Sequence, residues 1–378
     1  MFKKIIIYSL IFLLIFTNSV ISSNTFKTLE SYYYILAFGI DYEDSNYKLT
    51  IQILEPSPSS SGPSEEKPIL YSKTGSSFEE CINNLEKSLS RTINLSHTST
   101  IFLSKKLLEE KNINEIISSL GNNTELRSNT FILISNNSAE ETLKTISNTN
   151  ETFTPKIYQK IIDSTFDVSH KNLCTFGTLF KSVKNNNTPI LIPLFEIINE
   201  NNYFINNLAL INNGKYISSI SNLEHSYYHL LTNSIQKENI NFINPNNPNE
   251  YINLDMEKYK NTTTKISFVN SSPFVSIKLY PQFIIKSSGE HYNYLSNNNI
   301  KSLEQDLNKY LSENITHFLY KTYMINNSDL LNISKKFKSK VLTLEDYNSY
   351  QINKLYQNTI FKVEVNSQII SSALFNKQ

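Results

Sequence analysis

Few residues in this chain have the type and spacing that chemistry requires. His225 and His229 lie four residues apart beside Glu224, and on a helix two imidazoles at this spacing share a face that could bind a metal ion. Glu224 lies outside the pair, whereas zinc proteases carry the glutamate between the two histidines. Two polar residues on a surface helix are the simpler interpretation. We therefore assign no catalytic, cofactor-binding or metal-ligating residue and expect no cofactor.

Other candidate groups for catalysis are isolated. The chain has no Gly-x-Ser-x-Gly turn for a serine nucleophile, and the nearest pattern, Gly75-Ser76-Ser77, predicts a helix N-cap. Asp41 and Asp44 fall in a predicted hairpin turn, where aspartate is favoured for local hydrogen bonding. His97 precedes a predicted strand, which favours a capping or packing role. These patterns point away from an enzyme.

The two cysteines, Cys81 and Cys174, fit no zinc or redox spacing. Cys81 falls on the apolar stripe of a predicted helix, which favours a small buried side chain over a disulfide. A bond between the two cysteines stays open as the alternative, because exported proteins form disulfides.

The N-terminus predicts export. Lys3 and Lys4 precede an apolar run at residues 5–16, and small and polar residues follow, which is the pattern of a secretory signal cleaved before Ser23. An uncleaved anchor is the alternative, since residues 5–21 are at the lower limit for spanning a bilayer. A buried helix is the least favoured interpretation. We expect the body of the protein outside the cytoplasm.

Length and charge limit the remaining possibilities. A chain of 378 residues predicts two or three domains, and 39% apolar residues suffice for a core. Charged residues make up 18% of the chain and leave a net charge of +1. This balance argues against a nucleic-acid partner, which requires a basic face.

The periodicity of apolar residues predicts an α+β fold with mixed sheets and packed helices. Residues 33–40 form a continuous apolar run typical of a buried strand, and 47–53 alternate like a strand that pairs back on it. A capping box at Ser302 and a stripe from Leu303 to Leu319 predict one long helix on an antiparallel C-terminal sheet. The expected units are a signal peptide or membrane anchor over 1–22, an N-terminal α+β domain over 23–150, a small middle region over 151–204 and a C-terminal α+β domain over 205–378.

Several short motifs occur in a characteristic order. They are Tyr33–Asp41, which ends in Gly-Ile-Asp, then Tyr47–Pro56, Tyr71–Gly75, His97–Lys106, Arg127–Ser135 with Ala139–Leu143, Pro189–Glu196, and Leu208–Leu210 with Gly214-Lys215. Together they resemble the C-subunit family of spore germination receptors over nearly the whole chain after the signal.

The resemblance implies a subunit without enzymatic activity on the outer face of the spore inner membrane. Its partners would be a multi-span, transporter-like subunit and a second membrane subunit, and the complex would respond to nutrient germinants. The family's lipidated cysteine is expected at about Ser23, but no cysteine precedes Cys81, so we assign no lipidation site. A retained anchor, attachment through partners, or release are the alternatives.

Two other functions stay open from the sequence. One is a free extracytoplasmic solute-binding protein, which would need a cleft between its halves. The other is an unrecognised exported hydrolase.

Overall fold

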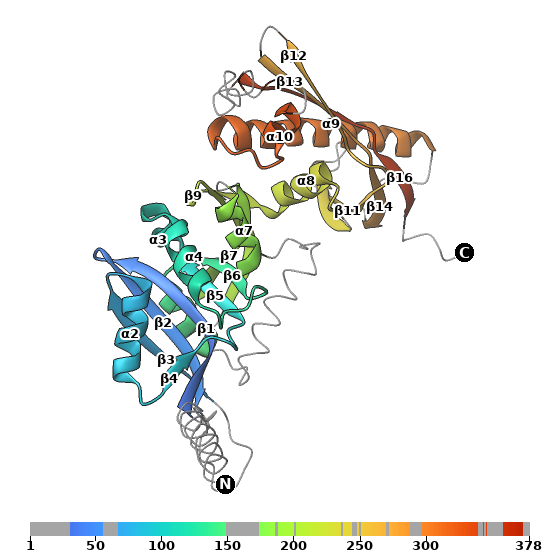
Figure 1. Ribbon diagram of the computed structural model, residues 1–378. Helices are drawn as coiled ribbons and strands as arrows, with labels where there is room; N and C mark the ends of the chain where they lie inside the picture. The colour runs from blue at the N-terminus through green and yellow to red at the C-terminus, as the bar shows by residue number, and fades with distance from the viewer. Residues whose placement is uncertain are drawn as a thin grey trace, which may run out of the picture.

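The computed structural model describes residues 31–55, 67–148, 174–185, 188–199, 202–235, 237–243, 248, 251–269, 272–287, 297–338, 343, 345 and 358–372. Within these ranges, a nine-stranded sheet is followed by sheets of four and three strands (Figure 1). The predicted α+β class with mixed sheets is confirmed. The predicted signal segment and half of the expected middle region (residues 151–173, 186–187 and 200–201) lie outside the described residues.

The nine-stranded sheet has the order β3-β2-β1-β5-β6-β7-β8-β9, and β4 pairs with the start of β1. β1 is antiparallel to β2 and parallel to β5, and β6 continues the parallel part. The strands are β1 (Tyr32–Glu43), β2 (Asn46–Glu55), β3 (Lys67–Gly75), β4 (Thr92–Asn94), β5 (Thr100–Ser104), β6 (Phe131–Ser135), β7 (Ile190–Asn199), β8 (Asn202–Asn212) and β9 (Lys215–Ser221).

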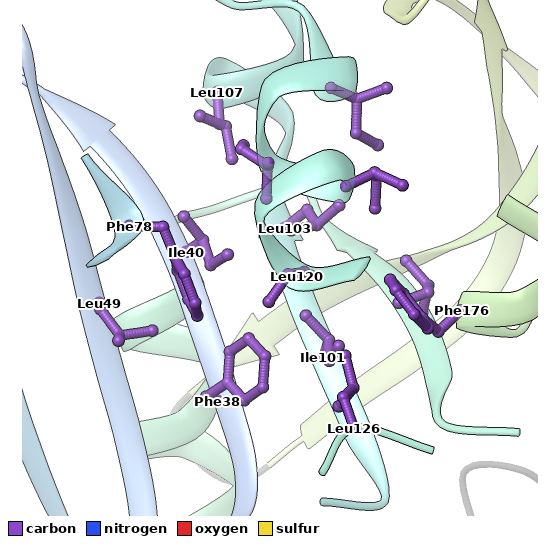
Figure 2. Packing of buried hydrophobic residues seen from close by; sticks show 14 of the residues in the cluster. Phe38, Ile40, Leu49, Phe78, Ile101, Leu103, Leu107, Leu120, Leu126 and Phe176 are labelled. Carbon is purple, nitrogen blue, oxygen red and sulfur yellow. The ribbon is translucent and has the colours of Figure 1, made fainter. Parts of the chain in front are cut away.

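Helices cover both faces of this sheet, which explains the continuous apolar runs of its central strands. On one face, side chains of α2, α3, α4 and α7 form a core with Phe38, Ile40 and Ile101, as Figure 2 shows. On the other face, α5 packs against Ala37 and Phe102. The helices are α2 (Phe78–Ser88), α3 (Lys105–Glu110), α4 (Ile113–Asn122), α5 (Ala139–Asn148) and α7 (Phe176–Lys184).

The C-terminal part packs two smaller sheets against one long helix (Figure 1). The stripe from Leu303 to Leu319 is buried, as predicted, because residues three and four apart share one face of α9. The four-stranded sheet contains β10 (Glu238–Ile243), β11 (Tyr251–Lys258), β14 (Pro281–Ser287) and β16 (Gln368–Ser372), and the three-stranded sheet contains β12 (Thr263–Val269), β13 (Ser272–Leu279) and β15 (Ile360–Val365). The helices are α8 (Asn222–Thr232), α9 (Asn297–Tyr320), the π-helix η2 (Lys321–Ile325) and α10 (Ile333–Lys338).

Two sequence predictions differ from this architecture. The C-terminal sheets are mixed rather than antiparallel, since β13 pairs parallel with β15 and β14 with β16. The long helix begins at Asn297, so Ser302 lies inside it and is not its N-cap. In addition, β8, at the start of the expected C-terminal domain over 205–378, pairs with β7 in the first sheet. Strand pairings such as β13 with β15 depend on partners far along the chain.

Candidate functional site

Asp41, one of the candidate acids, is a buried helix cap. It lies in β1 rather than in the hairpin turn, and only 1% of the residue is exposed. Its Oδ1 accepts a hydrogen bond from Ala139 N at 2.7 Å and its Oδ2 one from Glu140 N at 3.0 Å. Burial raises the pKa of the Asp41 carboxyl, and the two backbone donors partly offset this rise. The carboxylate therefore caps the first turn of α5.

Gly39, two residues before Asp41, allows α5 to approach this closely. A Cβ at Gly39 would lie 2.6 Å from the Cβ of Ala139. Any side chain at this position would push the helix away from the carboxylate that caps it. The Gly-Ile-Asp sequence thus has a structural role, which is to dock α5 on the sheet.

The other isolated candidates also have structural roles. Ser77 is the N-cap of α2, as predicted, and its hydroxyl accepts a hydrogen bond from Glu80 N at 3.2 Å. Cys81 is fully buried, as predicted, and burial raises the pKa of its thiol to about 11. Cys174 is also buried, and both thiols are free. A buried thiol with a raised pKa is a poor nucleophile at neutral pH.

The two histidines are on one helix, as predicted, but they are not at the surface. His225 and His229 lie on α8, each is 1% exposed, and their ring centroids are 4.0 Å apart. His229 Nδ1 lies 2.6 Å from Oε1 of Glu238, a residue at the start of β10 that the sequence analysis missed. Among the described residues, no three His, Cys, Asp or Glu side chains are placed to hold a metal ion. The contact between His229 and Glu238 therefore ties α8 to the C-terminal sheet.

The nine-stranded sheet and the C-terminal part meet at a junction that is held by a further set of polar contacts. Lys321 of η2 pairs with Glu224 of α8, with Nζ 2.7 Å from Oε1. Glu224 also closes a capping box with Ser221, at the end of β9. Asn326 Nδ2 donates to Ser218 Oγ at 2.8 Å, which joins the end of η2 to β9.

Apolar contacts cross the same junction. Leu208, Leu210 and Ile220 of the nine-stranded sheet belong to one core cluster with side chains of α8 and α9. This shared core and the polar contacts together favour a fixed arrangement of the two parts.

Four apolar side chains on the elements that make these contacts are exposed. We use the term junction surface for Ile217 of β9, Leu223 of α8, and Met324 and Ile325 of η2, which are 40%, 37%, 40% and 78% exposed. Exposed apolar side chains mark a protein contact site where they gather on one surface, and π-helical turns are frequent at functional positions. The junction surface is therefore the candidate docking site for another protein.

Two family models match the chain in sequence order. A spore germination protein N-terminal domain matches residues 26–197, and a spore germination B3/GerAC-like C-terminal domain matches residues 206–373. The chain belongs to this family of spore germination proteins. The resemblance in the order of motifs is thereby confirmed.

Individual relatives agree with this membership. The chain is 30% identical to spore germination protein KC of Bacillus subtilis over 118 residues, which is 29% of each chain. It is 20% identical to spore germination protein GerQC of Bacillus cereus over 314 residues, 83% of this chain and 85% of that protein. The crystal structure of the GerBC protein has the same fold, with a TM-score of 0.57 and 18% identity over 88% of this chain and 96% of that chain.

Proposed function

We propose that the chain is a subunit, without enzymatic activity, of a nutrient germinant receptor on the outer face of the spore inner membrane. The observation that carries this proposal is the occurrence of both family domains, in order, over residues 26–197 and 206–373. The partners would be a multi-span, transporter-like subunit and a second membrane subunit. The candidate groups for chemistry support the absence of catalysis, because Asp41 and Cys81 serve the fold.

A docking role follows from the way the two parts are joined. Because a shared core and the Asn326–Ser218 hydrogen bond join the two parts, partner loops that bind there would meet a preformed surface. Met324 and Ile325 would supply apolar contact area that is exposed in the chain alone.

Membrane attachment without a lipidated cysteine requires another tether. No helix among the described residues is long and apolar enough to cross a membrane. Residues 5–16 are almost wholly apolar, and we propose that the segment 5–21 is retained as an anchor in place of the lipid.

A complementation experiment tests this proposal. Spores that lack the chain should lose the response to a nutrient, and the wild-type chain should restore it. Ile325→Asp should reduce the response at least about tenfold if a charge is buried at the partner interface. The matched control is Ile198→Asp, because Ile198 is 61% exposed in β7 and lies outside the junction surface. Equal responses of the two variants would exclude docking at the junction surface, and an unchanged response without the chain would exclude the receptor role.

A further inference from the structure

The end of the N-terminal domain where β1 begins lies opposite the C-terminal domain. β4 and the start of β1 are at the far end of the nine-stranded sheet from α9 (Figure 1). This end also carries the turn that leads from β4 to β5. The surface there is consequently the one nearest to the chain that precedes Tyr32.

The sequence before β1 limits how far this end can be from a membrane. Ten residues, 22–31, separate the proposed anchor segment 5–21 from Tyr32. Fully extended, they span at most about 35 Å. If the apolar segment is retained, the start of β1 is held within this distance of the bilayer, and the C-terminal domain is held farther out.

The side chains at this end suit a lipid headgroup layer. Tyr32 and Tyr34 are half-buried, with ring centroids 6.2 Å apart, and the exposed His97 ring packs edge-on against Tyr34 at 4.6 Å. The exposed guanidinium of Arg91 lies 5.2 Å from the ring of the buried Tyr33. Tyrosine is enriched at the headgroup level of membrane proteins, and arginine binds phosphate with parallel hydrogen bonds.

A hollow beside Arg91 has room for a headgroup phosphate. Its volume is about 390 Å³, and it is lined by Ser31, Glu86, Leu89, Ser90, Arg91 and Thr92. Glu86, an acid among the described residues of this lining, accepts a hydrogen bond from Ile93 N at 3.2 Å. Glu125 likewise accepts from Leu95 N at 2.9 Å. Both carboxylates are therefore engaged by backbone donors of the β4 segment, while the arginine is at the surface.

We propose that this end of the domain, which we name the headgroup face (Tyr32, Tyr34, Ser90, Arg91 and His97), rests on the surface of an anionic phospholipid bilayer. Arg91 binds headgroup phosphate in the hollow, and the tyrosines lie at the level of the headgroups. The proposal rests on the membrane anchoring proposed above, and it adds which surface faces the lipid. It also implies that the junction surface is free to meet partner loops above the bilayer.

Site-specific fluorescence quenching tests the proposal on the full chain. The protein is reconstituted in vesicles of phosphatidylcholine and phosphatidylglycerol that contain a lipid with a quencher on its headgroup. Because Cys81 and Cys174 are 0% and 2% exposed, a thiol-reactive fluorophore should label only an introduced cysteine. One variant carries Ser90→Cys at the headgroup face, and the control carries Lys215→Cys, an exposed position at the start of β9.

The label at position 90 should be strongly quenched and the label at position 215 should not. Arg91→Gln should weaken quenching at position 90 in vesicles with phosphatidylglycerol, because one cation near an anionic surface changes binding by about fivefold. Lys106→Gln, which removes a cation that is 60% exposed on α3, should have no effect.

Two results would overturn the proposal. Equal quenching at both positions in membrane-bound protein would show that another surface faces the lipid. A chain that stays in the supernatant would show that neither anchor nor headgroup face binds lipid. The receptor role itself does not depend on either result, since it is tested by the nutrient response and by recovery of a membrane partner.

Discussion

The contact between Gly39 and Ala139 gives the sharpest test of how the N-terminal domain is built. Replacing Gly39 with alanine puts a Cβ 2.6 Å from the Cβ of Ala139, whereas carbon atoms in contact are normally about 3.5–4.0 Å apart. The helix α5 must then move by about 1 Å, which takes Ala139 N and Glu140 N away from the Asp41 carboxylate. Overpacking of this kind costs about 1–3 kcal/mol. Alanine also reduces the backbone entropy of the unfolded chain, which stabilises the protein by about 0.5–1 kcal/mol. We therefore expect Gly39→Ala to lower the free energy of unfolding by about 1–2 kcal/mol.

Removing the other Cβ, with Ala139→Gly, shows whether the stability lost in Gly39→Ala comes from this contact. Ala139→Gly alone should cost about 1 kcal/mol, because glycine is unfavourable in a helix. In the double variant the two Cβ atoms no longer meet. The free energies of unfolding should then be non-additive, and the double variant should be more stable than the sum by about 1 kcal/mol.

Urea unfolding followed by far-UV circular dichroism measures these differences, because the chain has no tryptophan. Hydrogen exchange of peptides from α5 gives a local reading, which should be faster in Gly39→Ala and slower again in the double variant. Additive effects within about 0.3 kcal/mol, with unchanged exchange in α5, would refute the close-contact argument.

Three further results are expected. Asp41→Asn should lower the free energy of unfolding by about 1–3 kcal/mol, because an amide NH₂ would face a backbone N–H. As the control in the same urea titration, Asp44→Asn in the exposed turn should change the free energy of unfolding by less than about 0.5 kcal/mol. His229→Leu should lower the free energy of unfolding by about 3–5 kcal/mol, because it leaves Glu238 buried without this partner. In a double-mutant cycle, leucine at both 229 and 238 should restore most of that free energy. Lysines of β13 and β15 lower the pKa of Glu364 from 4.5 to about 2. The stability from this carboxylate is therefore complete above pH 4.5 and lost as the pH falls towards 2, and Glu364→Gln should remove that pH dependence.

Local patterns in the sequence predicted the elements whose signals are short in range. The stripe from Leu303 to Leu319, the N-cap at Ser77 and the buried position of Cys81 all depend on neighbours within a few residues, and the structure has each of them as expected. These features follow from helical periodicity and capping chemistry alone.

The features that the sequence did not predict depend on partners far along the chain. Asp41 caps a helix that begins 98 residues later, so its own neighbours indicated only a turn. His229 was expected at the surface, because nothing near it identifies Glu238 or the strand that buries the pair. The parallel pairing of β13 with β15 joins segments separated by the whole of α9. The order of the short motifs in the sequence indicated the family, but contacts between residues this far apart in the chain were found only in the structure.

The most direct test of the receptor role is affinity purification of the tagged chain from detergent-solubilised spore inner membranes. We predict that a polytopic, transporter-like protein is recovered with it, which would also show that the absent N-terminal cysteine does not prevent assembly. Recovery of the chain alone, in the soluble fraction, would contradict the account and would favour a released binding protein.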